Sequence, residues 1–169
     1  GRDPFANHPG IRLLDENGDL KPEVLEILDL IKEYDATVAT GHISIGESIA
    51  VCNAARERGV RTVLTHPDWT CTTVPADVQT QLVKKGVILE KLWFDIGINH
   101  VTAEYMAQTI RDAGVENCFM ATDRGQSGKE YPVEGLMMFM DAMLDCGFSV
   151  EEIHIMTHEH PERVLGLRP

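Results

Sequence analysis

The stretch RTVLTH, residues 61–66, contains the pattern on which the fold of this 169-residue chain depends. It is a short run rich in Thr and Val, which is typical of a strand. A helical stretch precedes it and ends near Gly59, where a helix C-terminal cap is expected, and another helical stretch follows it after a loop. We therefore predict a strand with a helix on each side.

The same alternation recurs about every two dozen residues, the length of a strand, a loop and a crossover helix. The predicted strands are 36–41, 61–65, 87–94 and 118–122, and the predicted helices are about 22–34, 46–58, 75–85, 103–113 and 133–146. Strands that each return through a helix lie parallel, so we predict an α/β fold. The pattern allows either an open doubly wound sheet or part of a barrel.

The two ends of the chain depart from this alternation of strands and helices. Residues 1–20 are rich in Pro, Gly and Asn, and we predict a loop or linker there, with residues 21–169 forming one domain. Near the other end, Ser149 and Glu152 form a capping box that predicts a short last helix. A polar turn and a closing helical turn through Leu165 are expected to follow it.

Composition excludes several classes of protein. The net charge of -12 and the pI of about 4.9 argue against nucleic acid or an anionic membrane as a partner. No stretch approaches the roughly 20 apolar residues of a membrane-spanning helix, and residues 1–5 do not resemble a signal peptide. The four cysteines are scattered, which argues against a disulfide framework and a cysteine zinc site. We expect a cytoplasmic protein.

Three of the four predicted strands end in Thr followed, directly or after one Gly, by a possible metal ligand. The sequences are ATGH ending at His42, LTHP containing His66, and ATDR containing Asp123. In parallel α/β proteins the binding and catalytic groups gather at the carboxyl ends of the strands. We therefore expect two imidazoles and one carboxylate to converge on one face.

This set of side chains suits a divalent metal ion, with zinc as the first choice and manganese or iron as alternatives. Water bound to such an ion has its pKa lowered toward neutrality, and a nearby carboxylate can take its proton. Asp123 is our candidate for this catalytic base and for a metal ligand. A lone His at a strand end is more often an ordinary hydrogen-bonded loop residue, but three such residues in register favour a metal site. Asp123 alone could instead support the turn at 125–128, although its place after an apolar strand favours a functional role.

Further polar side chains could contact a substrate at the same edge. Glu90 interrupts an apolar strand, so it must point into a site or outward to a partner such as Lys91 or Lys84, and both interpretations are equally open. His100 follows the third strand and could reach the mouth of the site, although an ordinary polar loop also explains it.

The loop after the fourth strand is polar and rich in Gly, and Arg124 and Gln126 are candidates for binding an anionic or amide group there. Trp69 could line a pocket or pack in the core. His158 and His160 form an H-x-H pair, but they lie beyond the last predicted helix, and a surface turn is the better interpretation.

Four motifs together resemble the C-terminal half of amidohydrolase-like TIM-barrel proteins, and most closely an uncharacterised branch of predicted metal-dependent hydrolases. They are GHIS at 41–44, THPD at 65–68, ATDRGQ at 121–126 and HPERVLGL at 160–167. The resemblance implies a His at the end of strand five, a His at the end of strand six and an Asp at the end of strand eight around one or two metal ions. By position these are His42, His66 and Asp123.

The family's H-x-H on the first strand and its usual fourth-strand ligand, commonly a Lys, have no counterpart here, and Asp95, Lys91 and His8 do not map onto them. The resemblance therefore implies the C-terminal half, strands five to eight, of a (β/α)8 TIM barrel. Such a chain would be a fragment of a longer protein, would associate with a missing N-terminal half or as a homo-oligomer, or would remain an open half-barrel.

The expected function is that of a metal-dependent hydrolase that uses metal-activated water on an amide, lactam or ester bond of a small-molecule substrate. A metal-dependent lyase or decarboxylase of the same fold is an alternative. So is a non-catalytic half-barrel assembly module.

Overall fold

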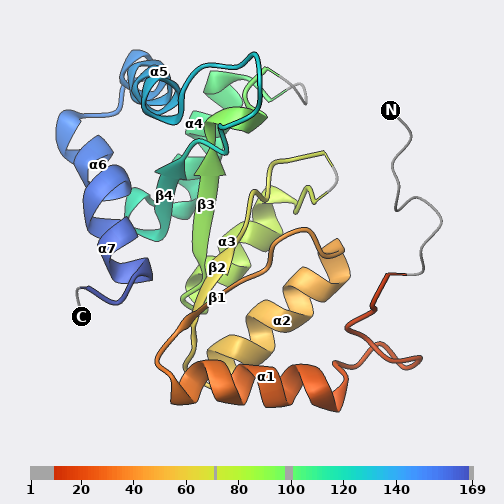
Figure 1. Ribbon diagram of the computed structural model, residues 1–169. Coiled ribbons are helices and arrows are strands. Elements are labelled where there is room, and N and C mark those ends of the chain that lie inside the picture. Colours follow the sequence, from red (N-terminus) through yellow and green to blue (C-terminus); the bar gives the residue numbers. More distant parts are fainter. Residues whose placement is uncertain (1–9, 71, 98–100, 168–169) are drawn as a thin grey trace.

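Strands and helices alternate along the part of the chain that the structure describes, which is residues 10–70, 72–97 and 101–167 of a computed structural model (Figure 1). The strands are β1 (Thr37–Ala39), β2 (Arg61–Leu64), β3 (Ile88–Leu92) and β4 (Cys118–Ala121). The helices are α1 (Pro22–Glu33), α2 (Ile45–Glu57), α3 (Ala76–Lys84), α4 (Ala103–Ala113), α5 (Pro132–Asp145), α6 (Val150–His154) and α7 (His160–Val164). The predicted α/β fold is confirmed, with strand and main-helix positions that differ from prediction by a few residues at their ends.

The four strands form one parallel sheet in the order β1-β2-β3-β4. Each strand therefore pairs with the next one along the chain, and the described strands contain no point at which the order reverses. The crossover helices are neighbours in the same order, because α2 contacts α3, α3 contacts α4 and α4 contacts α5. Consecutive right-handed crossovers place their helices on one face of a sheet, which this set of contacts matches.

The main core lies between the sheet and these helices. The strand register aligns Leu64 with Leu89 and Leu89 with Cys118, so their side chains point to the same face. They pack with Met106 and Ile110 of α4, and all five side chains are buried. The neighbouring residue along a strand, such as Glu90 after Leu89, faces the opposite side of the sheet.

The segment before α1 is ordered where it is described. Leu14 and Leu20 form an antiparallel bridge, and the backbone N–H of Leu13 donates to Glu47 Oε1 over 2.7 Å. Leu13 and Leu20 pack against a second, smaller core around α1 and α2 that contains the buried Leu28. Residues 1–9 of the predicted loop or linker lie outside the described residues.

The C-terminal segment differs from prediction. Ser149 caps α6 through the expected capping box with Glu152, but α6 then continues through a π-helical turn, Ile155–Glu159, into α7. The predicted polar turn is therefore wrong, and so is the surface position expected for His160, which is 2% exposed. The reason is periodicity, since Ile153, Met156 and His160 recur at helical spacing and form one buried face.

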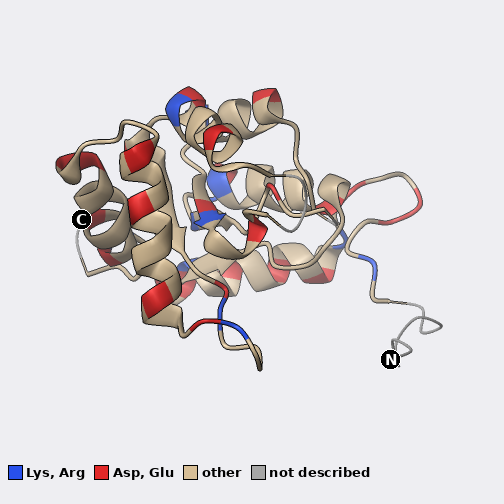
Figure 2. Ribbon diagram, turned by 90° about the horizontal axis from the view of Figure 1, so that it is seen from above, with Lys and Arg blue, Asp and Glu red and all other residues tan. Residues whose placement is uncertain are grey.

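Asp and Glu residues are distributed over several helices of the ribbon (Figure 2). Within the described ranges, no helix combines the length and apolar character needed to cross a membrane.

Candidate metal centre

The three predicted ligands follow strand ends that share one backbone conformation. The residue after the terminal Thr is left-handed in each case, with φ of 59° at Gly41, 32° at His66 and 48° at Asp123. Two of the three non-glycine residues with positive φ in the described chain are thus His66 and Asp123. For a residue with a side chain, this backbone conformation costs about 1–3 kcal/mol, and residues that adopt it tend to lie at functional sites. The repeated sequence pattern therefore corresponds to a repeated, strained turn.

These turns bring His42 and His66 into contact. Their Nε2 atoms are 3.2 Å apart and their ring centroids 4.5 Å apart. Thr40 helps to align the two strand ends, because its Oγ1 accepts a hydrogen bond from the backbone N–H of Thr65 over 3.0 Å. The Trp69 ring stands edge-on to both imidazoles, with centroids 5.3 Å from His42 and 5.2 Å from His66. Trp69 therefore packs against both imidazoles.

Thr72 orients the His66 ring. The Thr72 hydroxyl donates to the carbonyl of His66 over 3.0 Å, and its oxygen lies 2.8 Å from His66 Nδ1. Because a hydroxyl has a single hydrogen, we assign the proton of the neutral ring to Nδ1, which donates to Thr72. This tautomer leaves the Nε2 lone pair directed toward His42. Burial lowers the pKa of His66, so the neutral ring is favoured.

A pocket of about 170 Å³ opens at the strand ends and is lined by His42, Thr65, His66, Glu90, Leu92 and Asp123. The structure thus places Glu90 beside the predicted ligands, facing the pocket. Burial and the charge of Asp123 raise the pKa of Glu90, while a hydrogen bond with Thr65 acts in the opposite direction. Larger hollows, of about 450 Å³ between α4 and α5 and about 620 Å³ beside residues 12–18, contain no imidazole in their linings, and one of about 370 Å³ near the C-terminus includes a single one, His154.

The separation of the two imidazole nitrogens is that of a hydrogen bond between them and is also close to the spacing of two zinc ligands, but the ligand set is incomplete. Two zinc–nitrogen bonds of about 2.0–2.1 Å at a tetrahedral angle place the nitrogens about 3.3 Å apart, close to the separation of the His42 and His66 nitrogens. The Glu90 and Asp123 carboxylates repel each other across the same pocket, a repulsion that a cation would relieve. Within residues 10–70, 72–97 and 101–167, however, no group of three or more His, Cys, Asp or Glu side chains is arranged to hold a metal ion.

The predicted substrate-contact residues after β4 brace the site in this structure. Arg124 pairs with Glu130, and its guanidinium lies over the Phe94 ring at 5.2 Å. Gln126 Nε2 donates to the carbonyl of Asp123 over 2.8 Å and so supports its left-handed turn. His100 lies outside the described residues.

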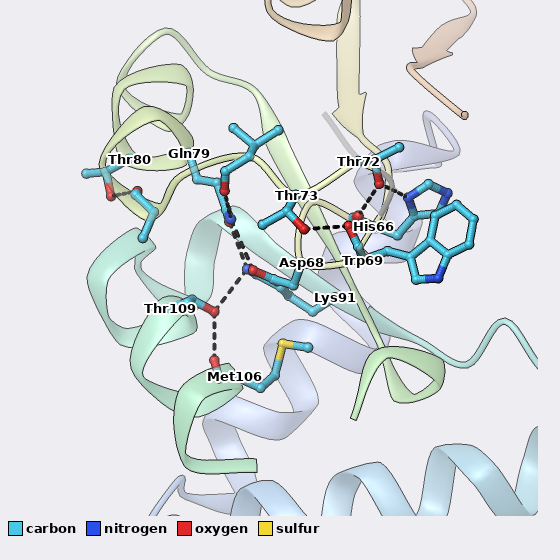
Figure 3. Close-up of polar contacts among 12 residues, drawn as sticks. His66, Asp68, Trp69, Thr72, Thr73, Gln79, Thr80, Lys91, Met106 and Thr109 are labelled. Atoms are coloured by element: carbon cyan, nitrogen blue, oxygen red, sulfur yellow. Dashed lines mark hydrogen bonds and ion pairs between the residues drawn. The ribbon is translucent and has the colours of Figure 1, made fainter. Parts of the chain in front are cut away.

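Behind the pocket lies a polar network that the sequence analysis did not identify. Lys91 and Asp68 form an ion pair of 2.7 Å in which both side chains are 0% exposed (Figure 3). Asp95 lies nearby with 1% exposure, and neither of its carboxyl oxygens has a hydrogen-bond partner. Burial, followed by the negative charge of Asp68, raises the pKa of Asp95 to about 7, although Lys91 opposes the shift. The signal in the sequence was the pair Glu90-Lys91, since neighbouring residues of a strand must face opposite sides.

No curated protein and no solved structure matches the chain. The model of one family of unknown function, DUF6282, matches residues 2–90. This match includes His42, His66 and Glu90 and ends before Asp123. Because it covers more than half of the 169 residues, the chain belongs to the DUF6282 family.

Proposed function

We propose that this chain carries half of the active site of a metal-dependent hydrolase of the amidohydrolase type. The observation that carries the proposal is the facing pair of Nε2 atoms of His42 and His66, 3.2 Å apart, at the carboxyl ends of adjacent parallel strands. Glu90 and Asp123 line the same pocket. Two imidazoles and two carboxylates at this edge of a parallel sheet are the side chains that a hydrolytic metal site uses.

The sheet order supports a barrel segment over a doubly wound sheet. A doubly wound sheet reverses its strand order at a switch point, with helices on both faces. Here the order is β1-β2-β3-β4, and the crossover helices contact one another in sequence. We propose that the strands are five to eight of a (β/α)8 barrel, closed by four further strands from the same polypeptide or a second chain.

Apolar side chains on α1, which precedes the first strand, and on α5, which follows the last, support such an association. Ile27 and Leu30 of α1 are 54% and 52% exposed, and Val133 and Met137 of α5 are 71% and 56% exposed. Each pair lies at helical spacing on one side of its helix. In a closed barrel the helices at both ends of this half would contact helices of the other half, which would cover these side chains.

The roles of the residues follow from their positions. A divalent metal held by His42 and His66 would polarise the scissile carbonyl and lower the pKa of the attacking water. The Asp123 carboxylate would accept a proton from that water and return it to the leaving group. Glu90, whose pKa is raised by burial and by the charge of Asp123, would serve as a second group for metal binding or proton transfer, and the Trp69 ring would cover one side of the two imidazoles. The substrate class is an amide, lactam or ester of a small molecule.

The test is a hydrolysis assay in ¹⁸O-labelled water with a panel of amides, lactams and esters, using the closed barrel, in which this half is joined to the four further strands, loaded with zinc, manganese or iron. We expect ¹⁸O in the carboxyl product and a fall in kcat of about 100-fold or more for Asp123→Asn, because a positioned general base contributes about that much. Asp145→Asn, an exposed acid on α5, is the control and should retain full activity. Unchanged turnover in Asp123→Asn contradicts the proposal, and product without ¹⁸O indicates lyase chemistry instead.

A further inference from the structure

We infer that Lys91 and Asp68 are positioning residues, which hold the His66 loop from behind so that the His66 ring faces the pocket. The inference rests on the proposed function for its consequence, metal binding. Figure 3 shows the two parts together, with Lys91 and Asp68 on one side of the loop after β2 and the contact of His66 with Thr72 on the other.

The network around Lys91 uses every polar hydrogen that its side chains possess. The three ammonium hydrogens of Lys91 go to Asp68 Oδ2 at 2.7 Å, Gln79 Oε1 at 2.9 Å and Thr109 Oγ1 at 3.0 Å. The Gln79 amide donates to Asp68 Oδ1 and to the carbonyl of Val74, and the Thr109 hydroxyl donates to the carbonyl of Met106. A closed network of this kind fixes one arrangement of the elements that contribute to it.

Those elements are β3, α3 and α4, and what they hold is the loop that carries His66. Asp68 lies two residues after His66. At the far end of the same loop, the Gln79 amide donates a hydrogen bond to the carbonyl of Val74. Between these points the loop is closed by backbone bonds from Trp69 to the carbonyl of His66 and from Val74 to that of Pro67. The Lys91 network therefore anchors both ends of the segment that orients the imidazole.

Lys91 acts only through this loop, because it cannot reach the pocket. Glu90 lines the pocket, and the next residue of a strand points to the opposite face. The partners of Lys91 on α3 and α4 confirm that it faces the helix layer. It is thus distinct from a lysine that would bind the metal or the substrate directly.

Two features explain why a charged pair serves here. A buried ion pair is often no more stabilising than apolar side chains of the same volume. It can, however, fix one arrangement of the elements around it, and we assign this role to Lys91 and Asp68. The left-handed backbone of His66, with φ of 32°, also requires neighbours that hold it in place. The ion pair meets that requirement, because it holds the loop on the side that faces away from the pocket.

The experiment compares the full chain with the variant Lys91→Met/Asp68→Asn, which removes both charges together and leaves neither stranded. Two quantities are measured: the ring ¹⁵N and ¹H signals of His66 in the metal-free protein, and the Zn²⁺ dissociation constant by calorimetry. We expect the His66 signals to shift toward those of a mobile imidazole that exchanges between tautomers, and the Zn²⁺ affinity to fall about 10- to 100-fold, as for other residues that orient a ligand. A variant that only lowered the free energy of unfolding would not change the tautomer of His66 in the folded protein.

Two further variants keep the outcome decisive. Thr109→Val removes a single acceptor of Lys91 and should shift the same signals less, so it tests the inference even if the double variant fails to fold. Arg111→Met/Glu152→Gln removes a partly exposed pair between α4 and α6 and should leave His66 unchanged. Unshifted His66 signals in the folded double variant, or in Thr109→Val if only that variant folds, overturn the inference. If the parent chain binds no Zn²⁺ while the His66 signals still shift, the proposed function fails and the positioning role stands.

Discussion

Glu90 and Lys91 are neighbours in β3, and they show two opposite ways in which a strand accommodates a charge. Lys91 faces the helix layer, is 0% exposed and has three hydrogen-bond acceptors. Glu90 faces a pocket, where burial and the charge of Asp123 raise its pKa. A buried charge with all its partners fixes structure, whereas a carboxylate held beside a like charge is available for binding or proton transfer.

The most disruptive way to test this contrast is to remove the lysine alone. Lys91→Met leaves the Asp68 carboxylate buried without its counter-ion, so we expect a loss of about 3–5 kcal/mol in the free energy of unfolding, measured with urea. Lys84→Met, on the exposed side of α3, is the matched control and should change stability by less than about 0.5 kcal/mol. A loss below about 1 kcal/mol for Lys91→Met would show that the pair is not closed as described.

Asp95 lies beside the Lys91 network but lacks its hydrogen bonds, so it should respond to pH. Its pKa in the folded protein is about 7 against an ordinary value of 3.8. Ionisation therefore opposes folding, and the parent protein loses stability as the pH rises from about 4 through 7. Asp95→Asn removes this loss. We expect it to gain roughly 2 kcal/mol over the parent at pH 8, allowing for water that reaches the carboxylate, and little at pH 4.

The measurement is the difference in unfolding free energy between Asp95→Asn and the parent at several pH values. Asp112→Asn, on α4, provides a control for adding an amide. A difference that is flat between pH 4 and 8 would mean that Asp95 has a partner and an ordinary pKa.

The smallest expected effect concerns Glu90. Glu90→Gln removes the repulsion with Asp123, so we expect a gain in stability of up to about 1 kcal/mol at pH 8 that disappears as the pH falls and the parent carboxyl becomes protonated. The same change should weaken Zn²⁺ binding, because it removes negative charge from the pocket. A loss of stability in thermal melts at pH 8, with unchanged Zn²⁺ affinity, would place Glu90 with Lys91 among the structural charges.

Local signals in the sequence predicted most of the fold. β1 and β2 follow from short runs rich in β-branched residues, and the start of α6 follows from the capping box of Ser149 and Glu152. The contact between His42 and His66 was foreseeable because the carboxyl ends of parallel strands meet at one edge of the sheet.

Long-range contacts could not be predicted in this way. Lys91 donates hydrogen bonds to Asp68, Gln79 and Thr109, which are so far from it in the sequence that no local pattern predicts the contacts. The helical spacing of Ile153, Met156 and His160 was a local signal for a buried face at His160, but no local pattern shows that α7 packs against β2 and β4. Asp123 stays a prediction as the third metal ligand, because the described residues hold no group of three ligand side chains and further ligands depend on the elements that close the site.

The most direct test of the central claim is Co²⁺ binding, followed by the visible absorption of the bound ion. We expect the parent chain to bind one equivalent with the intense bands of low-coordinate Co²⁺, and the variant His42→Gln/His66→Gln to lose this spectrum. The control His154→Gln/His158→Gln changes two ring-contacting histidines near the C-terminus and should keep it. A spectrum that is equally strong in the His42→Gln/His66→Gln variant, or absent from the parent, would contradict a metal centre at His42 and His66.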